Sequence, residues 1–110
     1  MFGITGNARF FLYEDPVDMR KGFEGLGVIA EQALSQELTS GAYFVFLNRQ
    51  RDRMKVLYWD VDGLAIWYKR LEKGCFLRNS SRGITLTRKD FFMLLEGIIP
   101  KCINRRYTSF

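Results

Sequence analysis

Residues 43–70, YFVFLNRQRDRMKVLYWDVDGLAIWYKR, decide the fold of this chain. Three runs rich in Val, Ile, Phe, Tyr and Trp are each about as long as a strand. Two polar turns separate them, which is typical of an antiparallel meander. Asp62-Gly63 predicts the second turn, because a two-residue hairpin loop needs positive φ and glycine accepts it without steric cost. We therefore expect three consecutive antiparallel strands.

The first turn, Asn48 to Arg53, carries three arginines, Arg49, Arg51 and Arg53. Guanidinium groups crowded at a hairpin tip repel one another and add nothing to an apolar core. An anionic partner placed opposite them relieves that repulsion. The turn is therefore the first candidate binding site.

The chain before the meander predicts one strand and one helix. Arg9 to Tyr13 has strand composition and is ended by Pro16, which removes a backbone donor and restricts the residue before it. Asp18 is a suitable N-cap, and a helix from there to about Glu37 gathers its apolar side chains on one face. These side chains are Met19, Phe23, Leu26, Ala30, Ala33, Leu34 and Leu38.

The chain after the meander predicts a second helix. Cys75 to Arg78 could add one short strand, and Thr87 to Asp90 has the form of a capping box, so a helix is expected from Thr87 to about Gly97. The expected fold class is α+β: an antiparallel sheet of four to five strands with two helices packed on one face.

The start of the first helix contains a local conflict. Arg20 and Lys21 lie where the helix dipole favours anions, and Gly22, Gly25 and Gly27 are poor helix formers. One interpretation is that backbone amides and basic side chains receive a phosphate there. The other is that the glycines allow close packing on the sheet while the basic pair faces solvent.

Length and composition indicate one domain over residues 1–110, with loose termini at 1–8 and 101–110. We expect a cytoplasmic protein, since neither an apolar run of about eighteen residues nor a charged leader with an apolar segment is present. If the protein binds DNA, we expect it at the nucleoid. Cys75 and Cys102 are expected to be free thiols, because two isolated cysteines rarely form a disulfide in that compartment.

The net charge of +5 is distributed unevenly. Residues 1–48 hold three Lys or Arg against six Asp or Glu, whereas residues 49–89 hold eleven against four. This asymmetry indicates a polyanionic partner, with nucleic acid favoured over membrane because no basic amphipathic helix is visible. The alternative is a solvated basic face that keeps a small protein soluble. The candidate DNA-binding residues are Arg49, Arg51, Arg53, Lys55, Lys69, Arg70 and Lys73, joined by Arg20 and Lys21.

Strand periodicity places aromatic residues beside these cations. Lys55 and Trp59 alternate with apolar residues and are expected on one outward face, and Trp67 lies near Lys69 on the next strand. Such aromatics can stack on bases or screen the sheet with amphipathic bulk.

No catalytic set is visible, and we expect no enzyme, cofactor, metal or small-molecule ligand. The chain contains no histidine, which excludes Ser-His-Asp and Cys-His catalysis and histidine-containing zinc sites. A magnesium site would need Asp60 and Asp62, with Asp52 or Glu96. Turn chemistry explains Asp60 and Asp62 better. The glycines match no phosphate-binding loop.

Taken in order, a set of sequence blocks resembles the TnpB accessory protein of the sixty-sixth family of bacterial insertion sequences. The blocks are Pro16 to Phe23, Tyr43 to Phe46, Arg53 to Asp60, Asp62-Gly63, Tyr68 to Glu72, Gly74, Phe76 and Leu94 to Gly97. The resemblance spans Arg9 to Ile98. It implies a protein that assists transposition beside a separate DDE-type transposase, with no established chemistry of its own.

Two hypotheses on function follow. In the first, the protein is a non-catalytic accessory factor of transposition that binds DNA through its basic hairpin surface. In the second, it is an adaptor that docks the transposase or a sister accessory protein of the same element without binding DNA.

Overall fold

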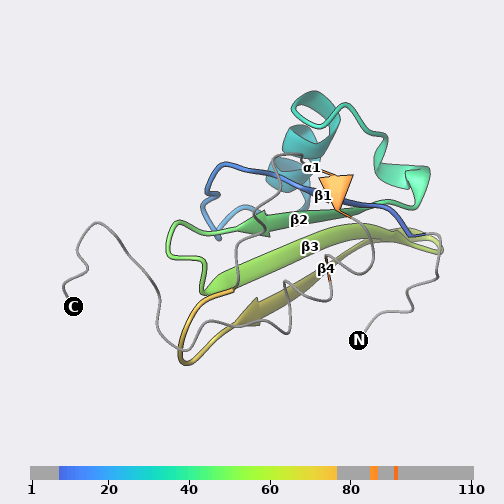
Figure 1. The fold of residues 1–110 in the computed structure, drawn as a ribbon. Coiled ribbons are helices and arrows are strands. Elements are labelled where there is room, and N and C mark those ends of the chain that lie inside the picture. Colours follow the sequence, from blue (N-terminus) through green and yellow to red (C-terminus); the bar gives the residue numbers. More distant parts are fainter. Residues whose placement is uncertain (1–7, 77–84, 87–90, 92–110) are drawn as a thin grey trace.

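The protein folds around one five-stranded sheet, whose order is β4-β3-β2-β1-β5. The computed structural model describes residues 8–76, 85–86 and 91. The strands are β1 (Phe10–Leu12), β2 (Tyr43–Leu47), β3 (Arg53–Asp60), β4 (Gly63–Arg70) and β5 (Thr85–Leu86). Strands β2, β3 and β4 form an antiparallel meander at the residues that the alternating pattern predicts (Figure 1).

The predicted fold class is wrong, because the sheet is mixed and not antiparallel. One α-helix is described in full, α1 (Phe23–Gln32), and Phe91 is also helical. Strand β1 pairs in parallel with β2 in the register Phe10↔Tyr43. Parallel neighbours need a crossover, which α1 and the short 3-10 helix η1 (Leu38–Ser40) supply between the two strands. The second predicted helix lies outside the described residues except for Phe91. The fifth strand is β5, which pairs antiparallel with β1 and was not predicted.

Helix α1 is shorter than the sequence predicts. It begins at Phe23 after Gly22, which has no side chain to act as a cap. Asp18 caps only a separate turn before the helix, in which its Oδ1 atom accepts a hydrogen bond from the backbone amide of Arg20 at 2.8 Å. Gly27 is buried, and a Cβ atom there would lie 3.1 Å from the Leu38 side chain. Gly27 therefore allows close packing, but against η1 and not against the sheet as the sequence interpretation has it.

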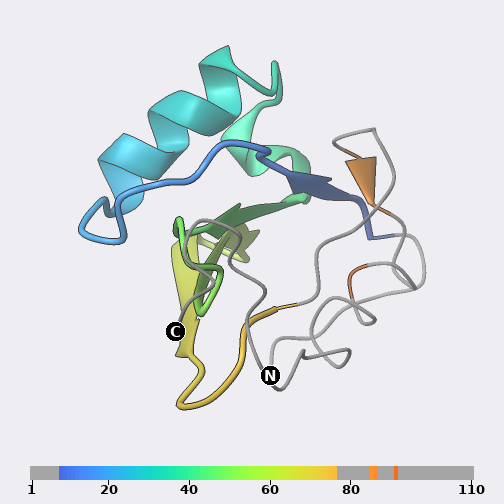
Figure 2. The same cartoon turned by 60° about the vertical axis from the view of Figure 1, so that its left-hand side comes forward.

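Both faces of the sheet are covered. On one face Leu26 and Ala30 of α1 pack on Phe44, Phe46 and Leu57. On the other face Phe76 and Phe91 pack against a cluster that contains Phe10, Leu12, Val45, Leu47, Met54 and Val56. Figure 2 shows α1 lying over the first face. The candidate site lies on this face and at the strand ends beside it.

The β3–β4 turn differs from the predicted one. Asp60 pairs with Gly63, so the two loop residues are Val61 and Asp62. The positive φ falls on Val61, at 56°, and not on the glycine. A β-branched residue in this region is strained.

Candidate nucleic-acid interface

The β2–β3 turn, residues 48–53, is organised by the side chain of Asn48. Its Oδ1 atom accepts hydrogen bonds from the backbone amides of Asp52 and Arg53, each at 3.0 Å. Its Nδ2 atom donates to the Asp52 carboxylate at 2.7 Å. Asn48 therefore stabilises the turn and is hydrogen-bonded to its acidic residue, Asp52. Arg49 stays exposed at the tip of the turn.

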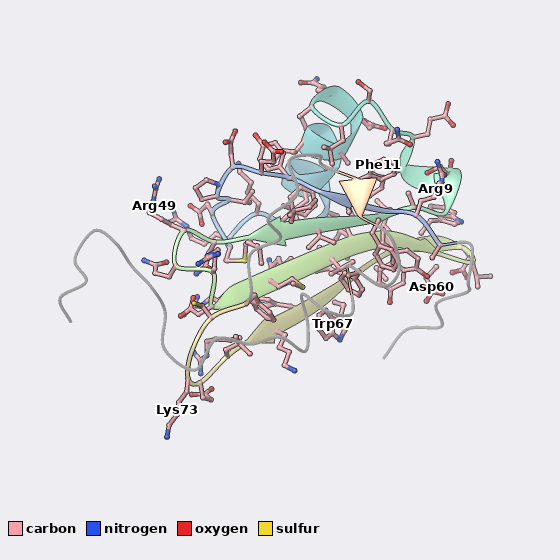
Figure 3. All side chains as sticks on the ribbon, viewed as in Figure 1. Arg9, Phe11, Arg49, Asp60, Trp67 and Lys73 are labelled. Atoms are coloured by element: carbon pink, nitrogen blue, oxygen red, sulfur yellow. The ribbon has the colours of Figure 1, made fainter. Side chains whose placement is uncertain are left out.

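The same turn is joined to the chain that follows β4. The backbone amide of Leu71 donates to the carbonyl oxygen of Asp52 at 2.8 Å, and that of Phe76 donates to Arg51 at 2.7 Å. These bonds bring the exposed Lys73 to the end of the sheet that carries Arg49. Figure 3 shows both side chains at this end and Asp60 at the opposite end.

The segment before α1 meets the turn from the other side. Its position is fixed by a 2.9 Å hydrogen bond from the backbone amide of Val17 to the carbonyl oxygen of Leu47. An open groove of about 910 Å³ lies between the two. Its lining consists of residues 16–20, five residues of the turn (Asn48, Arg49, Gln50, Asp52 and Arg53) and Tyr68 of β4. The groove therefore joins three parts of the chain that are distant in sequence.

Arg20 and Lys21 reach this region with different roles. The Arg20 guanidinium forms an ion pair with Asp18, with 2.7 Å between Nη2 and Oδ2. Hydrogen bonds from the Arg20 side chain and backbone lower the pKa of Asp18 to about 2 from its ordinary 3.8. The Lys21 side chain is exposed, and its backbone carbonyl accepts a hydrogen bond from Lys55.

Lys55 lies on the α1 face and is held by two contacts. Its Nζ atom donates to the carbonyl oxygen of Lys21 at 2.9 Å and lies 4.8 Å from the centroid of the Tyr68 ring. Lys55 therefore connects the sheet to the segment before α1. The sequence analysis did not identify Tyr68 as a groove residue. The signal was present, because counting outward from the hairpin turn along the two strands places Tyr68 opposite Lys55.

Arg53 and Arg70 are direct cross-strand neighbours. Like charges in this position destabilise a sheet. Arg70 is partly compensated, with 3.2 Å between its Nη2 atom and Oε2 of Glu72. Within the described part of the chain, Arg53 has no ion pair. An anion bound beside Arg53 and Arg70 would therefore stabilise the sheet by reducing the repulsion between them.

The nine predicted residues do not form one surface. Arg20, Arg49 and Arg53 line the groove, with Lys21 and Lys55 beside it. Lys69 pairs with Met54 and points to the opposite face of the sheet. Arg51 is half-buried, and Arg70 and Lys73 are exposed at the strand end.

The two tryptophans weighed for base stacking lie elsewhere. Trp67 packs against the cluster opposite α1, and Trp59 donates from its indole nitrogen to the carbonyl oxygen of Val61 at 3.2 Å. These positions favour screening of the sheet over stacking on bases.

Of the carboxylates weighed for magnesium, Asp60 and Asp62 share the β3–β4 turn, but Asp52 does not join them. Asp60 lies at the far end of the sheet from Asp52, whose carboxylate is held by Asn48, and Glu96 is outside the described residues (Figure 3). Across residues 8–76, 85–86 and 91, no three His, Cys, Asp or Glu side chains are placed to hold a metal ion. None of the helices in this part of the chain combines the length and the apolar character that a membrane crossing needs.

Comparison with known proteins gives one family and two relatives. The family model TnpB_IS66, described as IS66 Orf2 like protein, matches residues 8–105. The uncharacterized protein y4jC of Sinorhizobium fredii (strain NBRC 101917 / NGR234) is 30% identical over 108 residues, which cover 96% of this chain and 92% of that protein. The uncharacterized protein y4hO of the same strain is 32% identical over 94 residues, which cover 84% of this chain and 82% of that protein. No solved structure matches.

Proposed function

This chain belongs to the IS66 Orf2-like family, whose place is in insertion-sequence transposition, and on that premise we propose that it is a non-catalytic accessory protein that binds DNA. The groove between residues 16–20 and the β2–β3 turn is the centre of the binding surface. Arg70 and Lys73 extend this surface along the strand end. DNA binding would place the protein at the nucleoid in the cytoplasm.

One observation carries the proposal. Arg49 and Arg53 line a groove in which both acidic residues already have internal partners, Asp18 with Arg20 and Asp52 with Asn48. In the described residues neither carboxylate forms an ion pair with Arg49 or Arg53, so both guanidinium groups can bind an external anion, and the groove lining carries a net charge of +1 (Arg20, Arg49 and Arg53 against Asp18 and Asp52). DNA phosphates fit this need, because arginine binds phosphate through two parallel hydrogen bonds.

The test is fluorescence anisotropy with two labelled duplexes, one carrying the terminal inverted repeat of the element and one scrambled. We expect binding that weakens steeply between about 50 and 200 mM salt, because phosphate contacts release counterions. A triple change of Arg49, Arg51 and Arg53 to Ala is expected to weaken binding and flatten the salt dependence, with a nearly unchanged melting temperature. Unaltered binding by this variant would remove the turn from the proposed surface.

The DDE-type transposase and a sister accessory protein of the element are the protein partners we propose. The observation that favours such contacts is the outer side of α1, where Phe23 and Val28 are each about half exposed. Exposed apolar side chains on a small protein are candidate contacts for another protein. A pull-down with purified transposase in the presence of nuclease tests this partnership. A complex that survives nuclease while anisotropy detects no DNA binding would favour the adaptor function.

A further inference from the structure

The groove contains an aromatic ring as well as cations. Tyr68 lines it and is 48% exposed, and Met19 and Val17 add apolar lining. Duplex binding can use the hydroxyl of a tyrosine as a phosphate donor, but it makes no use of the face of an exposed ring. The ring is therefore unexplained by duplex binding alone.

The ring of Tyr68 is already in contact with Lys55 before any ligand arrives. Lys55 lies over the ring, 4.8 Å from its centroid, and is itself held by the 2.9 Å bond to the Lys21 carbonyl oxygen. An ordered ring loses little conformational entropy when a second planar group stacks on it. Aromatic side chains held this way beside cations are typical of sites for unpaired nucleotides.

The cations are placed to bind the backbone of the same strand. Arg53 is separated from Tyr68 by two positions of the β3–β4 ladder, since Lys55 pairs with Tyr68 and Arg53 with Arg70. Arg49 lies on the groove wall formed by the turn. A base stacked on Tyr68 would therefore have its flanking phosphates near these two guanidinium groups.

The geometry points to a site for an unpaired DNA strand, in which one base stacks on Tyr68 and the adjacent phosphates bind Arg49 and Arg53. This inference rests on the proposed DNA binding and specifies the form of DNA that is bound. The strand must be unpaired, because a base inside a duplex is stacked on its neighbours and cannot reach a ring that lines a groove. Single-stranded tails at a DNA end have the required chemistry.

The test compares three labelled oligonucleotides of one sequence by anisotropy: a single strand, a blunt duplex, and a duplex with a single-stranded tail. The wild-type protein is expected to bind the single strand and the tailed duplex roughly five- to tenfold more tightly than the blunt duplex, the scale of one stacked base.

Variants at position 68 locate the effect. Tyr68→Ala is expected to lose this preference, whereas Tyr68→Phe keeps the ring and is expected to retain it. Phe23→Ala is the matched control, because Phe23 is 49% exposed but does not line the groove. Thermal melting of each variant verifies that it is folded.

The outcomes separate this inference from the function on which it rests. Equal binding of all three oligonucleotides, or a preference that survives Tyr68→Ala, overturns the unpaired-strand site and leaves DNA binding standing. Binding of none of them at low salt overturns the proposed function itself. Loss of the preference in Tyr68→Ala, with retention in Tyr68→Phe and Phe23→Ala, supports the site.

Discussion

The side-chain ammonium of Lys55 donates a 2.9 Å hydrogen bond to the backbone carbonyl oxygen of Lys21, 34 positions earlier in the chain. This bond ties the middle strand of the meander to the segment that precedes α1. Because the groove lies between that segment and the β2–β3 turn, the bond also helps to hold the walls of the groove in place. A residue predicted to contact DNA thus has a structural partner in the fold.

Replacing Lys55 with Met should therefore destabilise the protein. The change keeps the length of the side chain but removes the hydrogen bond and the contact with the Tyr68 ring. We expect a loss of about 1–2 kcal/mol in the free energy of unfolding, from one hydrogen bond and one partly exposed cation–π contact. Urea denaturation measures it. Lys69→Met is the control, because Lys69 is exposed on the opposite face, and equal destabilisation by both variants would contradict the role given to Lys55.

Replacing Arg49 with Ala should weaken binding to DNA of any sequence. We expect the slope of the logarithm of the binding constant against the logarithm of salt concentration to decrease by about 1, for one lost phosphate contact. Arg9→Ala removes the same charge at the other end of the sheet (Figure 3). An equal decrease in both variants would mean that net charge, and not the position of Arg49, governs binding.

The sequence predicts those parts of the fold that depend on local pattern. The strands of the meander lie where alternating and β-branched residues place them, because strand periodicity is set by residues two positions apart. The basic turn is equally local, since all three arginines lie within residues 49–53.

The remaining features depend on contacts between distant residues. The parallel pairing of Phe10 with Tyr43 joins positions on either side of the crossover, so no local pattern indicates it. The groove depends on long-range contacts such as the hydrogen bond from Val17 to Leu47. The late start of α1 is also hidden from the local pattern, because Asp18 accepts the Arg20 backbone amide as an N-cap does, yet that turn does not continue into the helix.

Replacing Val61 with Gly should stabilise the protein. Val61 has a φ of 56° at the tip of the β3–β4 hairpin and is 89% exposed, so its side chain adds strain and little packing. Relief of roughly 1–2 kcal/mol of strain is offset by about 0.5–1 kcal/mol of backbone entropy. We expect a net gain of up to about 1 kcal/mol, seen as a rise of a few degrees in melting temperature. Val61→Ala removes the β-branch but keeps a Cβ atom at positive φ, so it should give a smaller gain, and a gain as large as that of the glycine variant would show that the Cβ atom is not the source of the strain.

Replacing Asp18 with Asn should reduce the dependence of stability on pH in acid. Hydrogen bonds from Arg20 lower the pKa of Asp18 to about 2 in the folded protein, whereas its ordinary value is 3.8. The unfolded chain therefore takes up the proton first, so the contribution of this carboxylate to stability is present above about pH 4 and is lost as the pH falls toward 2. Melting temperatures measured from pH 5 to pH 2 should fall less steeply for Asp18→Asn than for the wild type, and high salt should narrow the difference because the ion pair is exposed. Asp15→Asn is the control, since Asp15 makes no ion pair among the described residues. If both variants change the pH profile equally, the ion pair with Arg20 is not its source.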